Sequence, residues 1–262
     1  MVLFCGLFLL WPGAMMGPED LMIVRTNGPS LLLITQPDHA ALAGRVMREW
    51  RAGGLLHSPR RADILRAIDH HDNGWQEVDE APLIDESSGR ILDFVSAPDL
   101  LRQAVWPRGI ARLADTSYSA ALVAQHAIHV YSRYRQRPDW SAFFADMEAL
   151  RDAQLAQAHE TNLDELLRDY QAVRLGDLIS LVFCNGWTDP QREGNYEIRL
   201  DGDRVLVTPD PFGGRSIDIE VEGRELPDRP FASAADAQRA FDTAARQRLP
   251  GSVRGTGPIR DQ

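Results

Sequence analysis

Lysine is absent from the 262-residue chain, so all 28 basic residues are arginine. This absence excludes Schiff-base lysines, pyridoxal phosphate catalysis and phosphate binding by a P-loop or kinase-type lysine. The sequence has two cysteines, Cys5 and Cys184, which are too few for a disulfide framework or a cysteine-rich zinc site. The chemistry of the protein must therefore use histidine, carboxylate and arginine side chains.

The chain also lacks an excess of positive charge and a long apolar run. Its 38 acidic residues outnumber the 28 basic ones and give a net charge of −10, which argues against nucleic acid as a partner. The apolar run near the N-terminus is too short to span a bilayer, and it lacks the basic start and small-residue cleavage site of a secretory signal. We therefore predict no stable membrane span and a cytoplasmic location, with export as the alternative.

Hydrophobic periodicity divides the chain into a helical middle and strand-rich ends. Regular patterning begins at Met22, which suggests that the start codon lies too far upstream. Alternating apolar residues beside Asn27-Gly28 and Asp201-Gly202 predict hairpins. The predicted units are an extension outside the fold (1–21), an N-terminal hairpin (22–36), a helical domain (37–187), a β-rich appendage with a last helix (188–248) and a flexible tail (249–262). The predicted fold class is mainly α, with a small β-rich appendage.

One predicted helix, 61–73, carries a His-Asp pair on its apolar side. His71 follows Ile64 by seven residues, and Asp72 follows Leu65 by the same spacing, so both should face the core. The neighbouring His70 continues the polar face. We therefore expect His71 inside the protein and His70 near solvent.

Three other predicted helices repeat this feature. His39 opens the apolar stripe of the helix at 38–52, and Asp177 lies within the stripe of the helix at 162–185. His126 and His129 share one side of the helix at 117–135. Four helices therefore each point a histidine or an aspartate inward.

A shared metal ion would explain this pattern. Burying ionised Asp72 and Asp177 without a cation costs several kcal/mol, and neutral imidazoles bring no compensating charge. Mixed nitrogen and oxygen donors suit Mn, Fe, Zn or Ni better than calcium. The alternative for each residue alone is a hydrogen-bonded core histidine, or an aspartate that caps a helix or pairs with arginine. The conjunction favours one or two divalent transition-metal ions per chain.

The order His39, His71-Asp72, Asp177 resembles the HD-domain superfamily, which is named for its His…His-Asp…Asp metal site. More narrowly, the chain looks like a bacterial family of unknown function related to that superfamily. The matching segments are ITQPDHAALA (34–43), AIDHHDNGW (67–75), RGIARLA (108–114), ALVAQH (121–126) and LGDLISLVFCNGW (175–187). The resemblance implies an HD-like helical bundle for the middle of the chain.

It also implies a set of ligands. His39, His71, Asp72 and Asp177 would bind the core metal. His126 stands where binuclear members supply further histidines, with His129 as its companion.

Most members with a single metal hydrolyse phosphoesters, so the resemblance implies metal-activated water attacking a small phosphorylated molecule. Asp72 and the neighbouring acids Asp69, Glu77 and Asp79 are the candidates for proton transfer. Arg108 and Arg112 are candidates for binding phosphate, with a solvated helix face as the alternative. Trp75, and Trp187 in a similar -NGW context, could line the pocket, with two core tryptophans as the alternative.

Two further functions stay open at this point. A di-iron oxygenase of the inositol-oxygenase type would use His126 and His129 to complete a second iron site. A non-catalytic HD-like module would serve in ligand binding or assembly. The expected partners are a small-molecule substrate and a second copy of the chain in a homodimer.

Overall fold

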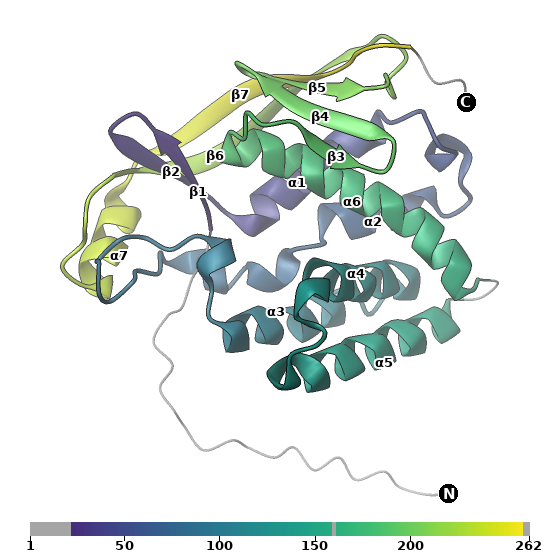
Figure 1. The fold of residues 1–262 in the computed structure, drawn as a ribbon, viewed down its shortest axis with the longest axis horizontal. Helices are drawn as coiled ribbons and strands as arrows, with labels where there is room; N and C mark the ends of the chain where they lie inside the picture. Colours follow the sequence, from purple (N-terminus) through teal and green to yellow (C-terminus); the bar gives the residue numbers. More distant parts are fainter. Residues whose placement is uncertain (1–21, 159–160, 259–262) are drawn as a thin grey trace, which may run out of the picture.

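A computed structural model describes residues 22–158 and 161–258, so the extension predicted at 1–21 lies outside the described residues. Figure 1 shows a twisted β-sheet along one side of the molecule and layers of helices beneath it. Helices α1 and α6 lie next to the sheet, whereas α4 and α5 lie on the side away from it. In the described part of the chain, no helix combines the length and apolar character needed to cross a membrane.

Seven α-helices occur among the described residues. They are α1 (Gln36–Arg48), α2 (Arg61–Asp69), α3 (Asp99–Ala111), α4 (Ser117–Val130), α5 (Ser141–Gln157), α6 (Leu163–Asn185) and α7 (Ala234–Thr243). Local signals fix the ends of α1 and α6. Thr35 caps α1 by accepting a hydrogen bond from the Asp38 main-chain N–H, and Asn162 caps α6 in the same way. Helix α6 ends at Gly186, whose positive φ of 70° suits glycine.

The strands found in residues 22–158 and 161–258 form one sheet of seven. They are β1 (Ile23–Asn27), β2 (Ser30–Ile34), β3 (Gln191–Glu193), β4 (Tyr196–Asp201), β5 (Arg204–Thr208), β6 (Ser216–Pro227) and β7 (Arg246–Gly255), in the order β1-β2-β6-β7-β5-β4-β3. The pairing of β5 with β7 is parallel and the other pairings are antiparallel.

This sheet corrects the predicted fold class. The expectation of a helical bundle with a small β-rich appendage is wrong, because both ends of the chain join one large mixed sheet. Strand β2 of the N-terminal hairpin pairs with β6, with Leu31 opposite Leu226. Both leucines are buried beside Phe231 and Phe241 in a second, smaller core. The two hairpins were predicted, but β7 and the pairing of segments so far apart in sequence were not.

The flexible tail predicted at 249–262 is also wrong over most of its length. Residues as far as Gly255 belong to β7, which lies between β6 and β5 inside the sheet. Val253 pairs with Ile217 on one side and Val205 on the other, and it is fully buried. The prediction for 259–262 lies outside the described residues.

Close packing of α1, α2 and α6 positions the candidate site. Gly176 on α6 has no side chain, and a Cβ atom there would lie 2.9 Å from Met47 and 3.1 Å from Ile68. The three helices can therefore approach closely at this level. The next residue of α6 is Asp177, so the contact holds this carboxylate near α1 and the end of α2.

Candidate metal centre

Five side chains from four parts of the fold meet in the helical layer. His39 comes from α1, His71 and Asp72 from the turn after α2, His126 from α4 and Asp177 from α6. The three histidines are at most 2% exposed, whereas the Asp72 and Asp177 side chains keep 12% and 18% of their surface. The two carboxylates therefore form the side of the cluster that water can reach.

The turn after α2 decides which member of the histidine pair points inward. Helix α2 ends at Asp69, earlier than predicted, and His70 follows with an exposed side chain. His71 is buried and its ring packs edge-on against those of His39 and His126, with ring centres 4.9 Å apart in each pair. The predicted placement of His71 inside and His70 outside is confirmed.

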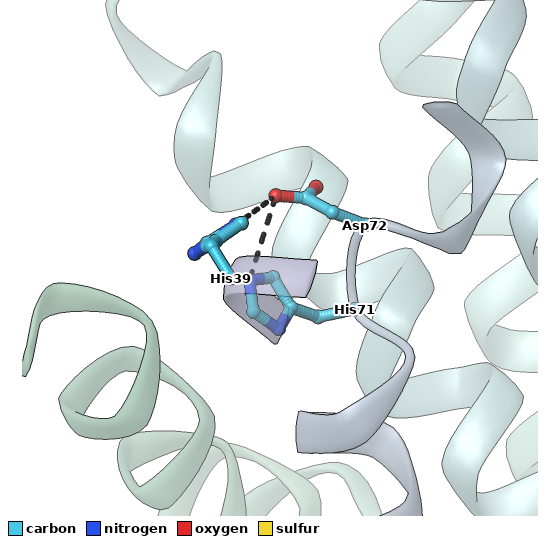
Figure 2. A group of neighbouring side chains, drawn as sticks. All are labelled: His39, His71 and Asp72. Atoms are coloured by element: carbon cyan, nitrogen blue, oxygen red, sulfur yellow. Dashed lines mark hydrogen bonds and ion pairs between the residues drawn. The ribbon is translucent and has the colours of Figure 1, made fainter. Parts of the chain in front are cut away.

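The imidazole Nε2 atoms face the carboxylates. Figure 2 shows His39 and His71 turned toward Asp72, whose Oδ2 lies 2.9 Å from His39 Nε2 and 3.5 Å from His71 Nε2. His71 Nε2 also lies 3.4 Å from Asp177 Oδ1, and His126 Nε2 lies 3.8 Å from Asp177 Oδ2. Each Nε2 atom thus has at least one carboxylate oxygen within 4 Å.

The Nδ1 atoms are engaged elsewhere, which constrains the tautomers. His71 Nδ1 donates to the main-chain carbonyl of Ile68 at 2.8 Å, so the neutral ring carries its lone pair on Nε2. His39 Nδ1 lies 2.9 Å from the Ser180 hydroxyl, which donates its own proton to the Asp177 carbonyl. The Ser180 oxygen must then accept from His39, which again leaves a lone pair on Nε2.

His126 follows the same arrangement. Its Nδ1 lies 3.0 Å from the hydroxyl of Tyr170. In the tautomer in which Nδ1 donates to this hydroxyl, Nε2 carries the lone pair. An imidazole whose second nitrogen is held by a carbonyl or hydroxyl is the usual environment of a metal-bound histidine.

The pKa values of the histidines and aspartates reflect the charges and the burial of the cluster. Burial alone would lower the pKa of His71, but the carboxylates of Asp72 and Asp177 outweigh it and raise this pKa to about 9. In return, His71 holds the pKa of both carboxyls below their ordinary value in spite of burial. Burial lowers the pKa of His126 to about 4, so that ring is neutral at pH 7. Without a metal, a proton on His71 therefore compensates the charge of the two partly buried acids.

These donors fit a metal ion. Two groups of three, His39-His71-Asp72 and His71-His126-Asp177, each have their donor atoms within 4.8 Å of one another. Donors that share one ion at about 2.1 Å lie roughly 3 to 4 Å apart. The separations of 2.9 to 3.8 Å between imidazole and carboxylate atoms fall in or near this range. His71 Nε2 is buried and without a hydrogen-bond partner among the described residues, as expected of a donor reserved for an ion.

His129 does not join either donor group found in the described residues. Its half-buried ring packs against Tyr170 with ring centres 5.6 Å apart, one turn of α4 away from His126. Residues at i and i+3 on a helix differ in direction by about 60°. The sequence therefore predicted correctly that His126 faces the cluster, whereas His129 does not join it.

The acids predicted for proton transfer have other partners. Asp69 forms an ion pair with Arg48, and Glu77 forms one with Arg112. Asp79 is buried and accepts a hydrogen bond of 2.5 Å from the Gln36 main-chain N–H at the start of α1. These three carboxylates therefore have partners outside the centre, whereas Asp72 lies in the centre itself.

The predicted substrate-binding residues are likewise placed elsewhere. Arg112 donates to the Asn73 carbonyl as well as to Glu77, so it holds the loop after Asp72. Arg108 is exposed on α3. Trp75 is 3% exposed and belongs to the main core, as in the core alternative; Trp187 is partly buried and packs against the same core.

Ser180 and Tyr170 were missed as members of the site. Both lie on α6 on the same side as Asp177, Ser180 three residues after it and Tyr170 seven residues before it. Tyr170 occupies a position of the apolar stripe of α6, two turns before Asp177. Its hydroxyl, at a position otherwise apolar, was the available signal that a buried polar partner was needed.

Comparison with known proteins identifies a family. A search of curated proteins found no match, and a search of solved structures found none either. A family model described as "Protein of unknown function (DUF3891)" matches residues 22–228, which include all five residues of the metal centre. The chain therefore belongs to the DUF3891 family.

Proposed function

We propose that the protein is a metal-dependent hydrolase that cleaves a small phosphorylated molecule. The observation that carries this proposal is the orientation of His39, His71 and His126. Their Nδ1 atoms bind a hydroxyl or a carbonyl, and their Nε2 atoms converge on two carboxylates. The order of ligands along the chain, which resembles the HD-domain superfamily, supports the same chemistry.

The donor set favours one ion over two. His71 belongs to both donor groups, and its Nδ1 atom is bound to a main-chain carbonyl. Its Nε2 atom can bind only one ion, so the two groups describe one centre with up to five donors. A di-iron oxygenase would need a second set of nitrogen donors, and His129 lies outside both groups.

The chain itself supplies the environment for hydrolysis. A bound divalent ion lowers the pKa of water and withdraws charge from a phosphoryl oxygen. Asp72 lies at the exposed side of the centre, and its contacts with His39 and His71 use Oδ2. We assign to Asp72 Oδ1 the role of accepting the proton of the attacking water. The buried histidines exclude bulk water from the other side.

Metal content is the direct test. The full chain, purified without an affinity metal column, is analysed by mass spectrometry for Mn, Fe, Zn and Ni. The expected result is about one ion per chain in the wild type, with loss in His71→Ala. His70→Ala is the matched control, because it removes the exposed neighbour and should keep the metal. No metal in the wild type, even after incubation with these ions, would overturn the proposal.

Hydrolysis is tested with the metal-loaded protein on a chromogenic phosphomonoester and a panel of phosphorylated metabolites. We expect turnover that His71→Ala and Asp72→Asn abolish and His70→Ala preserves. Metal without turnover on any phosphoester would favour the non-catalytic module. Two irons per chain with a visible absorption band would favour the oxygenase.

A further inference from the structure

Arg174 lies at the accessible edge of the metal centre. It precedes Asp177 by three residues on α6, which places the two side chains on neighbouring parts of one helix face. Both are only partly buried: the Arg174 side chain keeps 32% of its surface and that of Asp177 keeps 18%. Both side chains therefore reach solvent from adjacent turns of α6.

An ion pair holds this guanidinium in place. Arg174 Nη2 lies 2.6 Å from Glu193 Oε2 on β3, the short strand at one edge of the sheet. The Nε atom of Arg174 is buried and has no hydrogen-bond partner among the described residues. The group is thus oriented through one nitrogen, and donors remain for a second acceptor.

His129 stands beside it. Its ring contacts that of Tyr170, which is four residues before Arg174 on α6. Burial lowers the pKa of His129, and the charge of Arg174 lowers it further, whereas Asp177 acts in the opposite direction. His129 therefore lies within electrostatic reach of both residues, at the same edge of the centre.

The centre needs such donors if its substrate is anionic. The centre consists of two carboxylates and three imidazoles, and the Nδ1 atoms of the imidazoles are bound to other groups. The atoms that face the middle of the centre are therefore acceptors, which do not bind an anion. A phosphate dianion would approach two aspartates whose charge a divalent ion just balances. Both terminal nitrogens of Arg112 are engaged, Nη1 by the Asn73 carbonyl and Nη2 by Glu77, whereas Glu193 engages Arg174 through Nη2 alone.

We propose that Arg174, assisted by His129, binds the anionic oxygens of the substrate phosphate at the mouth of the metal centre, with Glu193 as the residue that positions Arg174. This inference rests on the proposed hydrolase function and specifies its substrate as a phosphate monoester dianion rather than a neutral molecule. Guanidinium suits this task because its fork of N–H donors matches phosphate oxygens.

The test is binding of inorganic phosphate to the metal-loaded full chain, measured by isothermal titration calorimetry. We expect Arg174→Gln to weaken phosphate binding by about tenfold or more with metal content unchanged, because hydrogen bonds to charged groups are the strong ones. His129→Phe keeps the ring contact with Tyr170 and should weaken binding less, by roughly threefold. Arg192→Gln, on the same strand as Glu193 and 78% exposed, is the charge-matched control and should bind like the wild type.

Glu193→Gln separates this role from a purely structural ion pair. The glutamine keeps an amide oxygen that can accept from Arg174 and hold it in position, but it removes the competing negative charge. Phosphate affinity should therefore be kept or increased in Glu193→Gln, while that of Arg174→Gln falls. Equal phosphate affinity in the wild type and Arg174→Gln, or loss of metal in Arg174→Gln, would overturn the inference. If phosphate binding depends on Arg174 but the protein hydrolyses no phosphoester, the hydrolase proposal is wrong and the anion-binding site at Arg174 is supported.

Discussion

His39 Nδ1 lies 2.9 Å from the hydroxyl of Ser180, and that hydroxyl donates to the main-chain carbonyl of Asp177. One serine thus fixes the tautomer of a predicted metal ligand on α1 and touches the residue that supplies another ligand on α6. Its own proton is committed to the carbonyl, so it can only accept from His39. The orientation of the His39 ring therefore depends on a residue outside the candidate ligand set.

This relationship predicts the effect of Ser180→Ala. Loss of the hydroxyl frees the His39 ring to rotate or to adopt the other tautomer, so metal affinity should fall by about 10-fold to 100-fold. The measurement is competition with a chromophoric chelator. Ser141→Ala is the matched control, since Ser141 also donates to a carbonyl three residues earlier, at the exposed start of α5. Equal affinity in Ser180→Ala and the wild type would show that His39 needs no such support.

Metal binding should release a proton. The carboxylates of Asp72 and Asp177 raise the pKa of His71 to about 9 in spite of burial, so the metal-free ring is charged at pH 7 and must lose its proton to bind an ion. The apparent association constant should therefore rise about tenfold per pH unit from pH 7 to 9 and level off above. Calorimetry in two buffers of different protonation enthalpy checks the released proton. An affinity independent of pH in this range would show that His71 is not a ligand.

The same shift has a consequence for the metal-free protein. Because the folded pKa of His71 is raised above its unfolded value of about 6.5, the stabilisation is complete below that pH and is lost as pH rises through about 9. Chelator-treated wild type should thus show a falling denaturation midpoint between pH 7 and 9. His71→Gln, which cannot carry the charge, should show a flatter profile over this range. Parallel profiles would contradict the assignment of this pKa.

We expect an apolar substitution at Gln36 to stabilise the folded protein. This residue of α1 is 1% exposed, and neither atom of its carboxamide has a hydrogen-bond partner among the described residues. An unsatisfied buried polar group costs about 1–3 kcal/mol, so Gln36→Met, of similar length and apolar, should raise the free energy of unfolding by about 1–2 kcal/mol. Urea denaturation measures this, with the exposed Gln171→Met as the control that should change nothing. A loss of stability in Gln36→Met would show that the carboxamide has a partner in solution.

Helix periodicity was enough to find the members of the metal centre, because the face of a helix is a local property. His39, His71, Asp72, His126 and Asp177 were each inferred from their spacing to apolar neighbours, and they converge. The same rule failed for His129, since a spacing of three residues leaves about 60° between side chains. It could not find Arg174 or Ser180 either, because their partners Glu193 and His39 come from other elements.

Strand pairing is the part that spacing cannot supply. The individual strands at 196–222 were predicted from alternation, yet which strands pair depends on contacts between distant segments. The hairpin at 22–36 gave no sign that Leu31 would lie opposite Leu226. The segment that forms β7 offered a weaker pattern still, because it contains Pro250, Gly251 and Gly255, which are typical of loops. Tertiary pairing overrides this local preference.

The position of β7 inside the sheet leads to a prediction about truncation. A chain that ends after Ala245 lacks β7, so β6 loses its partner along most of its length and β5 loses its parallel neighbour. The main-chain groups of β5 and β6 that pair with β7 would lose their partners, and Val205 and Ile217 would lose their neighbour Val253 and become exposed. We expect this variant to be insoluble or to lack cooperative thermal unfolding by circular dichroism. A chain that ends after Pro258 keeps every described residue and should unfold at the wild-type temperature. Wild-type stability in the shorter variant would show that residues 246–262 are dispensable, as a flexible tail would be.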